Sequence, residues 1–357
     1  LKYHDGTCCM TTIKKEKTIL EPVLVKVDRQ GLTESMHRGS AIIYHSTQGV
    51  LAAWGNPDKV IFPRSALKPI QVFTALSSGL TIANEQVAFG CASHHAEEMH
   101  IRMAEHWLSQ LNLSQEKHLV CGPVLPLDQR SLISVLQRAN STQSNGKTIA
   151  KRIYHGCSGK HCCQLAFCKH QGWDIDSYYE PQHPAQKALF SHLESLSDKP
   201  LEKIAIDGCS LPAPAMTLIG FAQAMAQLAS PQKLSRSEQK AASQIFESVT
   251  KFPFLTGGTS APNSLMTEKS AGTFFVKNGS EGVYACIIPN MRCSIVLKMA
   301  DGAMRAADTA MAGILSEYAK ELKIDASGAK HFAKLHIKNN AGDKIGKIYW
   351  NGGRLKI

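Results

Sequence analysis

Segments with the alternating apolar and polar residues of β-strands stand near both ends of this chain, and helical segments lie between them. The alternation is clear in residues 22–31 and 38–56, where the letters STQG at residues 46–49 indicate a hairpin turn. Strand patterns return in residues 272–289 and 292–302. This order predicts an α/β (α+β) protein in which strands from both ends share one antiparallel sheet flanked by helices.

The intervening segments carry helical spacing. Apolar residues recur in steps of three after Pro63 and predict a helix with one apolar face that ends at Gly79. Further helices are expected to begin near Glu97, after the glycines of residues 156–159, and near residue 303. Residues 201–207 read as a buried strand, followed by a tight loop and a long helix.

The length and composition fit one large globular domain. The chain has 357 residues, of which 43% are hydrophobic, enough to bury a sizeable core. We expect residues 1–17 to form an N-terminal extension outside a domain that covers residues 18–357. No run approaches the ~20 apolar residues of a membrane helix, and the N-terminal residues lack the apolar core of a secretory signal. The sequence therefore favours the cytoplasm.

The cysteine content argues against a disulfide-bonded protein, and the distribution of charge argues against a nucleic-acid-binding protein. Eleven cysteines is an odd number, and Cys162, Cys163 and Cys168 crowd one expected helix, so reduced thiols are favoured over disulfides. The formal charge is +11, but lysine and arginine are scattered without interleaved aromatic residues. We therefore expect no nucleic acid among the partners.

A serine and a lysine stand three residues apart at the start of the first expected helix. Ser65 and Lys68 would lie one turn apart, and a neutral lysine can remove the proton of a serine hydroxyl. Lysine normally titrates near 10.4, so burial or neighbouring cations such as Arg64 must lower its pKa. The alternative is an ordinary polar helix start.

Lys277 ends an expected strand and is followed by Asn-Gly. The triplet is similar to the Lys-Thr-Gly strand that penicillin-recognising serine enzymes combine with a Ser-x-x-Lys helix. An exposed lysine beside an Asn-Gly hairpin turn is the alternative.

Two further clusters contain residues that could bind a metal ion or transfer protons. Cys157 and Lys160 open a helix, and Cys209 follows an expected strand; two thiolates can hold zinc, although buried structural cysteines explain the pattern equally well. Residues 91–100 contain many titratable side chains around Ser93 and His94. Such a cluster is typical of a metal site, of a proton relay or of a solvated helix start.

Eight fragments in order resemble one family, the class 3 L-asparaginases of the Rhizobium etli inducible, thermolabile type. They are RSALKPIQ, ASHHAEEMH, CGPVLP, HGCSGKH, HPAQ, DGCSLPAP, KNGSEGVY and LKMADGAMRAA. The resemblance implies an amidohydrolase that converts L-asparagine to L-aspartate and ammonia. It also implies a homodimer and a fold similar to the serine β-lactamases and glutaminases.

The resemblance assigns roles residue by residue. Ser65 with Lys68 and Ser93 with Lys277 match two Ser-Lys tandems. From the chemistry of the pair we expect an acyl-enzyme on Ser65, and Ser93 is the alternative nucleophile. The expected zinc (Zn²⁺) ligands are Cys157, Lys160 and Cys209. The expected substrate-contacting residues are Arg64, His94, Asp207 and Gly279.

The chain departs from the family pattern at several positions. His155 and Gly156 replace two asparagines, and Cys162 and Cys163 replace an Ala-Gly pair. Ala96 stands where glycine is usual, and Ser280 where alanine is usual.

Two alternatives of other kinds remain at this point. One is a β-lactam-recognising serine hydrolase of the same fold, although the usual Ser-Asp-Asn element is missing. The other is a non-catalytic protein that binds zinc or senses redox state through its cysteines.

Overall fold

The fold is described from a computed structural model, which covers residues 21–141 and 149–353. The expected N-terminal extension, residues 1–17, lies outside the described residues. Within them, no helix is long and apolar enough to cross a membrane.

The strands form one large antiparallel sheet and one small sheet. The large sheet has eight strands in the order β10-β11-β1-β2-β9-β8-β7, with β3 also paired to β2. Its bounds are β1 Val23–Arg29, β2 Leu32–His45, β3 Gly49–Trp54, β7 Phe275–Gly279, β8 Val283–Ile288, β9 Cys293–Met299, β10 Lys334–Lys338 and β11 Lys344–Trp350. Since Val25 of β1 pairs with Trp350 of β11, the prediction that strands from both ends share one antiparallel sheet is confirmed.

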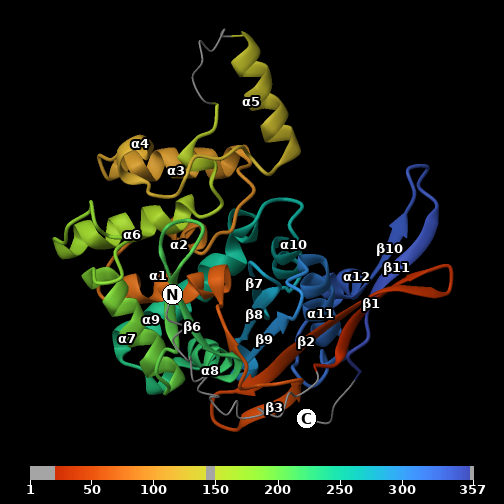
Figure 1. Cartoon of the computed structure of the whole chain (residues 1–357). Helices are drawn as coiled ribbons and strands as arrows, with labels where there is room; N and C mark the ends of the chain where they lie inside the picture. The colour runs from red at the N-terminus through yellow and green to blue at the C-terminus, as the bar shows by residue number, and fades with distance from the viewer. Residues whose placement is uncertain (1–20, 142–148, 354–357) are drawn as a thin grey trace, which may run out of the picture.

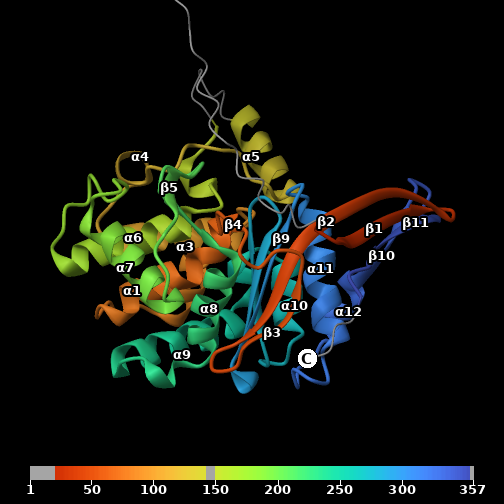
Figure 2. The ribbon, with the colours of Figure 1, turned by 60° about the horizontal axis from the view of Figure 1, so that its bottom comes forward.

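Helices cover both faces of this sheet (Figure 1; Figure 2). The described helices are α1 Lys68–Ser77, α2 Asn84–Gly90, α3 Glu98–Gln110, α4 Gln115–His118, α5 Gln129–Ser141, α6 Ser158–Gln171, α7 Pro184–Ser197, α8 Leu218–Ala229, α9 Arg236–Lys251, α10 Pro262–Glu268, α11 Met304–Glu317 and α12 Ser327–Ala333. Successive strand residues belong to opposite cores: Ile42 is part of the core that includes residues of α1, α6 and α8, whereas Ile43 is part of the core that includes residues of α11. The sheet is thus the middle of three layers, as expected for this fold class.

The small sheet corrects one prediction. Its order is β4-β6-β5, with β4 Val60–Ile61, β5 Lys203–Ile206 and β6 Pro212–Thr217. The prediction of a buried strand at 201–207 is wrong, because β5 is an edge strand whose Ile206 is 62% exposed. The buried strand is β6, which we expected to be a loop because prolines, which lack an N–H, disfavour a paired strand.

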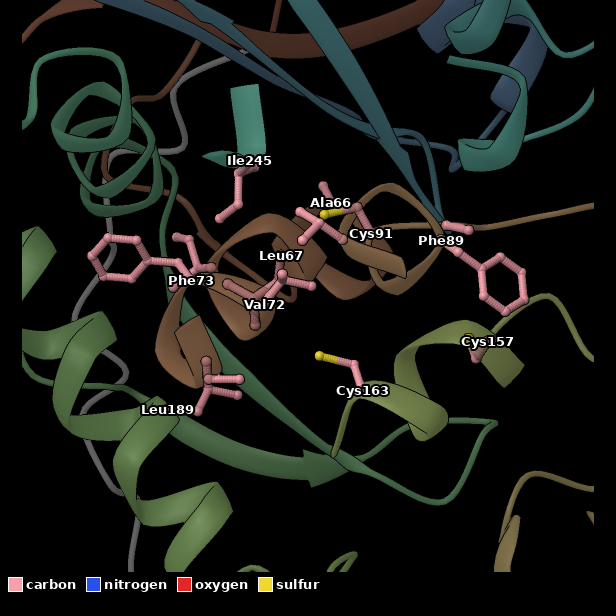
Figure 3. Close-up of a cluster of buried hydrophobic side chains, with 14 of the residues drawn as sticks. Ala66, Leu67, Val72, Phe73, Phe89, Cys91, Cys157, Cys163, Leu189 and Ile245 are labelled. Atoms are coloured by element: carbon pink, nitrogen blue, oxygen red, sulfur yellow. The ribbon is translucent and has the colours of Figure 1, made fainter. Parts of the chain in front are cut away.

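Helix α1 is buried on all sides, not on one face as the spacing predicted. Every residue from Lys68 to Leu76 is buried. Figure 3 shows side chains of α1 among residues of surrounding elements, including Cys163 of α6, Leu189 of α7 and Ile245 of α9. A lysine at the start of such a helix is removed from water whatever its partner.

The described cysteines are all free and buried. They are Cys91, Cys121, Cys157, Cys162, Cys163, Cys168, Cys209, Cys286 and Cys293. None of these described cysteines is joined to another in a disulfide.

A half-buried carboxyl of α11, next to the sheet, generates a prediction about stability. Asp308 accepts a hydrogen bond from the Tyr284 hydroxyl at 2.7 Å, and burial raises the pKa of Asp308 to about 6. The native state therefore binds more protons than the unfolded chain between about pH 4 and pH 6, so this group costs stability as the pH rises through that range. We expect Asp308→Asn, which cannot ionise, to raise the free energy of unfolding by about 2 kcal/mol at pH 7.5 and to change it little at pH 4.

Urea unfolding at the two pH values checks this expectation. The exposed Asp58 offers a matched control, and Asp58→Asn should show no such dependence on pH. An equal effect of Asp308→Asn at both pH values would contradict the assignment.

Candidate active site

A cavity of about 350 Å³ opens where the 3₁₀ turn Arg64–Leu67, the loop before α3 and the end of β7 meet. Five of the predicted site residues line it: Ser65, Ser93, His94, Cys157 and Gly279. The other six, Arg64, Lys68, Lys160, Asp207, Cys209 and Lys277, do not line it. The structure therefore brings both serines to one cavity, while the lysines lie outside its lining.

The hydroxyl of Ser93 lies between two buried lysines. Lys277 Nζ is 2.8 Å from Ser93 Oγ, and Lys68 Nζ is 3.1 Å from the same atom. Lys68 also donates to the carbonyl oxygens of Ala92 and Gly156, the latter at 3.4 Å. Both expected tandem lysines therefore converge on one serine.

Burial favours the neutral form of both amines. Lys68 and Lys277 are no more than 1% exposed. Desolvation is the main reason that the pKa of Lys68 is lowered. Desolvation, followed by repulsion from Lys68, holds the pKa of Lys277 well below its usual range. A neutral lysine beside a hydroxyl is the arrangement that serine activation requires.

Ser65 reaches the cavity from a tight turn. Arg64 adopts a left-handed backbone with φ of 51°, which is uncommon for a residue with a side chain. Among the described residues, the Ser65 hydroxyl has no hydrogen-bond partner within the usual limits, and Lys68 points to Ser93 instead. Ser65 therefore leaves its hydroxyl available to a ligand.

Gly279 allows the turn that carries Ser65 to approach β7. A Cβ at this position would lie 2.6 Å from the Pro63 carbonyl oxygen and 2.9 Å from the Ala66 backbone nitrogen. Only glycine permits this separation without a shift of the backbone.

His94 serves the architecture of the cavity wall. Its Nε2 lies 2.8 Å from Ser158 Oγ, and its Nδ1 accepts a hydrogen bond from the Ala96 backbone N–H at 3.1 Å. The ring also stacks on Phe89 and His100. Since burial lowers the pKa of His94 well below its usual range, the ring is neutral and both nitrogens are occupied.

The expected zinc ligands lie together at the edge of the cavity, with Cys157 in its lining and Lys160 and Cys209 outside it. Lys160 Nζ is 2.9 Å from Cys209 Sγ. Hydrogen bonding to Cys209 is the main reason that the pKa of Cys157 is lowered. All three side chains are buried, and two sulfur donors with an amine are chemically suited to zinc. In the part of the chain that the structure describes, no three His, Cys, Asp or Glu side chains are arranged to hold a metal.

Asp207 and Arg64 form an ion pair next to this cluster. Arg64 donates to Asp207 Oδ1 through Nε at 3.1 Å and through a terminal nitrogen at 2.6 Å. Burial opposes the ionisation of Asp207, but the hydrogen bonds and charges of Arg64 and Lys160 lower its pKa. The carboxylate therefore balances the cations around the serines.

Sequence reasoning missed the residues that hold the lysines. Lys277 donates to the backbone oxygen of Asn278 at 2.6 Å and to its side-chain Oδ1 at 2.8 Å. Asn278 directly follows Lys277 in the sequence, and this adjacency could have indicated that Asn278 accepts hydrogen bonds from the lysine. The carbonyl oxygens of Ala92 and Gly156 carry no side-chain signal, so only the fold shows their role.

Comparison with known families supplies the identification. The family model described as L-asparaginase II matches residues 25–350, nearly the whole chain. The chain belongs to the L-asparaginase II family. Membership supports asparaginase activity in general and an amidohydrolase as the class of enzyme.

Comparison with other proteins adds the following. No curated protein sequence shows significant similarity to the chain. A β-lactamase from Mycobacterium bovis is 13% identical, with a TM-score of 0.43 over 78% of this chain and 94% of its own. A candidate β-lactamase from Bacteroides dorei is also 13% identical, with a TM-score of 0.43 over 80% of this chain and 92% of its own.

One departure from the family pattern now has a structural meaning. Ala96 of this L-asparaginase II family member adopts a φ of 60°, where glycine is more favourable than a residue with a Cβ. Its backbone N–H donates a hydrogen bond to His94 Nδ1. The strained backbone at Ala96 is therefore three residues from Ser93 in the sequence.

The Gly279 contact predicts a loss of activity on substitution. In Gly279→Ala, the methyl group must push the turn with Ser65 away from β7, because both opposing atoms belong to the backbone. We expect kcat/KM for amide hydrolysis to fall by about 100-fold, as a misplacement of about 1 Å can do. Gly122→Ala is the control, since a Cβ there meets no atom within 4 Å. Equal activity of the two variants would show that the contact does not position Ser65.

Proposed function

We propose that this protein hydrolyses L-asparagine to L-aspartate and ammonia through an acyl-enzyme, using its two serines and two buried lysines. The observation that carries the proposal is the placement of the Ser93 hydroxyl between Lys68 and Lys277 in a cavity shared with Ser65. Membership of the L-asparaginase II family supports the substrate.

Ser65 is the proposed acyl acceptor and Ser93 the proton relay. The Ser65 hydroxyl is available at the cavity, whereas Ser93 is already bonded to both amines. In the first step, the Ser65 oxygen bonds to the side-chain amide carbon while its proton passes through Ser93 to neutral Lys277. The C–N bond then breaks, and the proton leaves on ammonia. Water hydrolyses the ester by the reverse path.

Backbone N–H groups would stabilise the oxyanion of this reaction. Ser65 and Gly279 line the cavity, and fixed backbone N–H donors from such residues would lower the barrier to acyl transfer. Arg64 and Asp207 form an ion pair outside the cavity lining, and from there they would attract the carboxylate and ammonium of the substrate.

Zinc fits the donor chemistry of the buried cluster. Cys157, Lys160 and Cys209 would hold the ion, and it would supply a positive charge that favours binding of the substrate's carboxylate. Because the pKa of Lys160 is raised by its neighbouring thiols, metal binding must compete with the proton on this amine.

Release of ammonia from L-asparagine tests the function, and the serine variants test the roles. We expect Ser65→Ala and Ser93→Ala each to lower kcat by at least about 1,000-fold, in keeping with the loss of a nucleophile or its proton relay. Acid quench during turnover, followed by intact mass measurement, should show an aspartyl adduct on the native chain and none on Ser65→Ala.

The control is Ser109→Ala, since Ser109 is exposed on α3, and it should keep full activity. An adduct on Ser65→Ala would contradict the assignment of the nucleophile. Hydrolysis of penicillin without ammonia release from asparagine would contradict the function.

Light scattering of the same samples reports whether the active form is the homodimer that the family resemblance supports.

Metal analysis tests the zinc proposal independently of activity. We expect Cys209→Ser to lose most of the zinc that co-purifies with the native chain, as measured by mass spectrometry of the metal, because one of two thiolate ligands is removed. Cys168→Ala, a change on α6 outside the cluster, should keep the metal. Equal zinc in both variants would place the ion elsewhere.

A further inference from the structure

The cavity at the two serines is lined by both polar and apolar side chains, and we call the apolar group its apolar wall. Ser65, Ser93 and Asn278 are among the polar lining residues and come from the 3₁₀ turn, the loop before α3 and β7. The wall comes from other segments: Val124, Leu125 and Leu127 precede α5, Tyr154 ends a 3₁₀ turn, and Met304 begins α11. Elements far apart in sequence therefore place five apolar side chains at one opening.

These apolar side chains include two that the fold leaves exposed. Leu127 is 73% exposed and Leu125 is 39% exposed. Exposed apolar side chains that line a concave site are typical of a surface that a ligand covers.

Free L-asparagine does not use such a wall. Its polar groups are a carboxylate, an ammonium and an amide, and it presents almost no apolar surface. The cavity of about 350 Å³ lies in the range of sites for larger ligands, which begins at about 300 Å³. Beyond it, a second hollow of about 580 Å³ shares His95 and Leu127 with the first. The space and the apolar lining therefore both exceed what asparagine needs.

The position of the charges indicates which part of a longer substrate meets the wall. Cys157 is the member of the charged cluster that reaches the cavity, and Arg64, Asp207, Lys160 and Cys209 lie behind it. The amino-acid head of a substrate is drawn toward these charges. With the carbonyl carbon at the serines, the amide nitrogen is left to face the apolar wall, since the second hollow is lined mainly by polar and charged residues such as Glu97 and Asp128.

We propose that the site also hydrolyses β-aspartyl secondary amides whose nitrogen carries a short apolar group, with that group packed on the wall of Leu125 and Leu127. The inference rests on the proposed asparaginase function. The acyl bond to serine forms as the C–N bond breaks, the amine leaves with the proton, and water completes the reaction. The net change is R–CO–NH–R′ + H₂O → R–COO⁻ + R′–NH₃⁺, with no further reactant.

Kinetics on three substrates test this: L-asparagine, N4-isobutyl-L-asparagine and N4-(2-hydroxyethyl)-L-asparagine. The last two are of similar size and differ in the polarity of the substituent. We expect the isobutyl amide to be turned over with a kcat/KM about tenfold above that of the hydroxyethyl amide, because burial of an apolar group on the wall favours it.

Variants test the wall itself. In Leu127→Ser, the ratio of kcat/KM for the isobutyl amide to that for asparagine should fall by about fivefold or more. The matched control is Ile133→Ser, because Ile133 is also an exposed apolar residue, at 54%, but does not line the cavity. Its ratio should equal that of the native chain.

The outcomes separate this inference from the proposed function. Hydrolysis of asparagine with less than about a hundredth of that kcat/KM for the isobutyl amide overturns the inference alone, since the wall then contributes nothing. No hydrolysis of any of the three amides overturns both. An equal ratio in Leu127→Ser and Ile133→Ser overturns the assignment of the wall.

Discussion

The burial of two amines beside one hydroxyl is the constraint on which this site depends. Lys68 begins a helix that is enclosed on every side, and Lys277 lies in β7, the strand at one edge of the large sheet. Two ammonium groups at such positions would repel each other without water to screen them. The fold meets this constraint with carbonyl and amide oxygens as acceptors, while desolvation lowers the pKa of both amines and so favours their neutral forms. The same shift that relieves the repulsion provides the base.

Compensation of charge continues behind the cavity. Lys160 faces the sulfur of Cys209, and Asp207 accepts hydrogen bonds from Arg64. Each buried cation therefore has an anion or a thiol beside it, which offsets part of the desolvation cost. These charged groups lie outside the cavity lining, apart from Cys157, and the lining itself includes apolar residues from loops and helix ends.

Much of this arrangement could be predicted from the sequence, but the contacts could not. The alternation near both ends predicted the sheet, and the family motifs selected Ser65, Ser93 and both lysines. The spacing of Lys68 from Ser65 suggested that they pair, yet Lys68 binds Ser93 because α1 is packed into the core and directs its amine there. Strand β6 escaped prediction because its prolines disfavour strand structure, and β5 was misread because apolar residues on an edge strand look like core. Carbonyl acceptors, such as that of Gly156, have no sequence signature at all.

The pairing of β1 with β11 has a consequence for how the chain is made. Val25 meets Trp350, so the first strand emerges from the ribosome long before its partner and has an unpaired edge during that time. Lys277 also arrives after all of α1 to α10 have been synthesised. In the unfolded chain both lysines are hydrated and charged. Because burial lowers the pKa of both amines, folding releases protons into the solvent, and the packing that encloses these lysines also creates the free base.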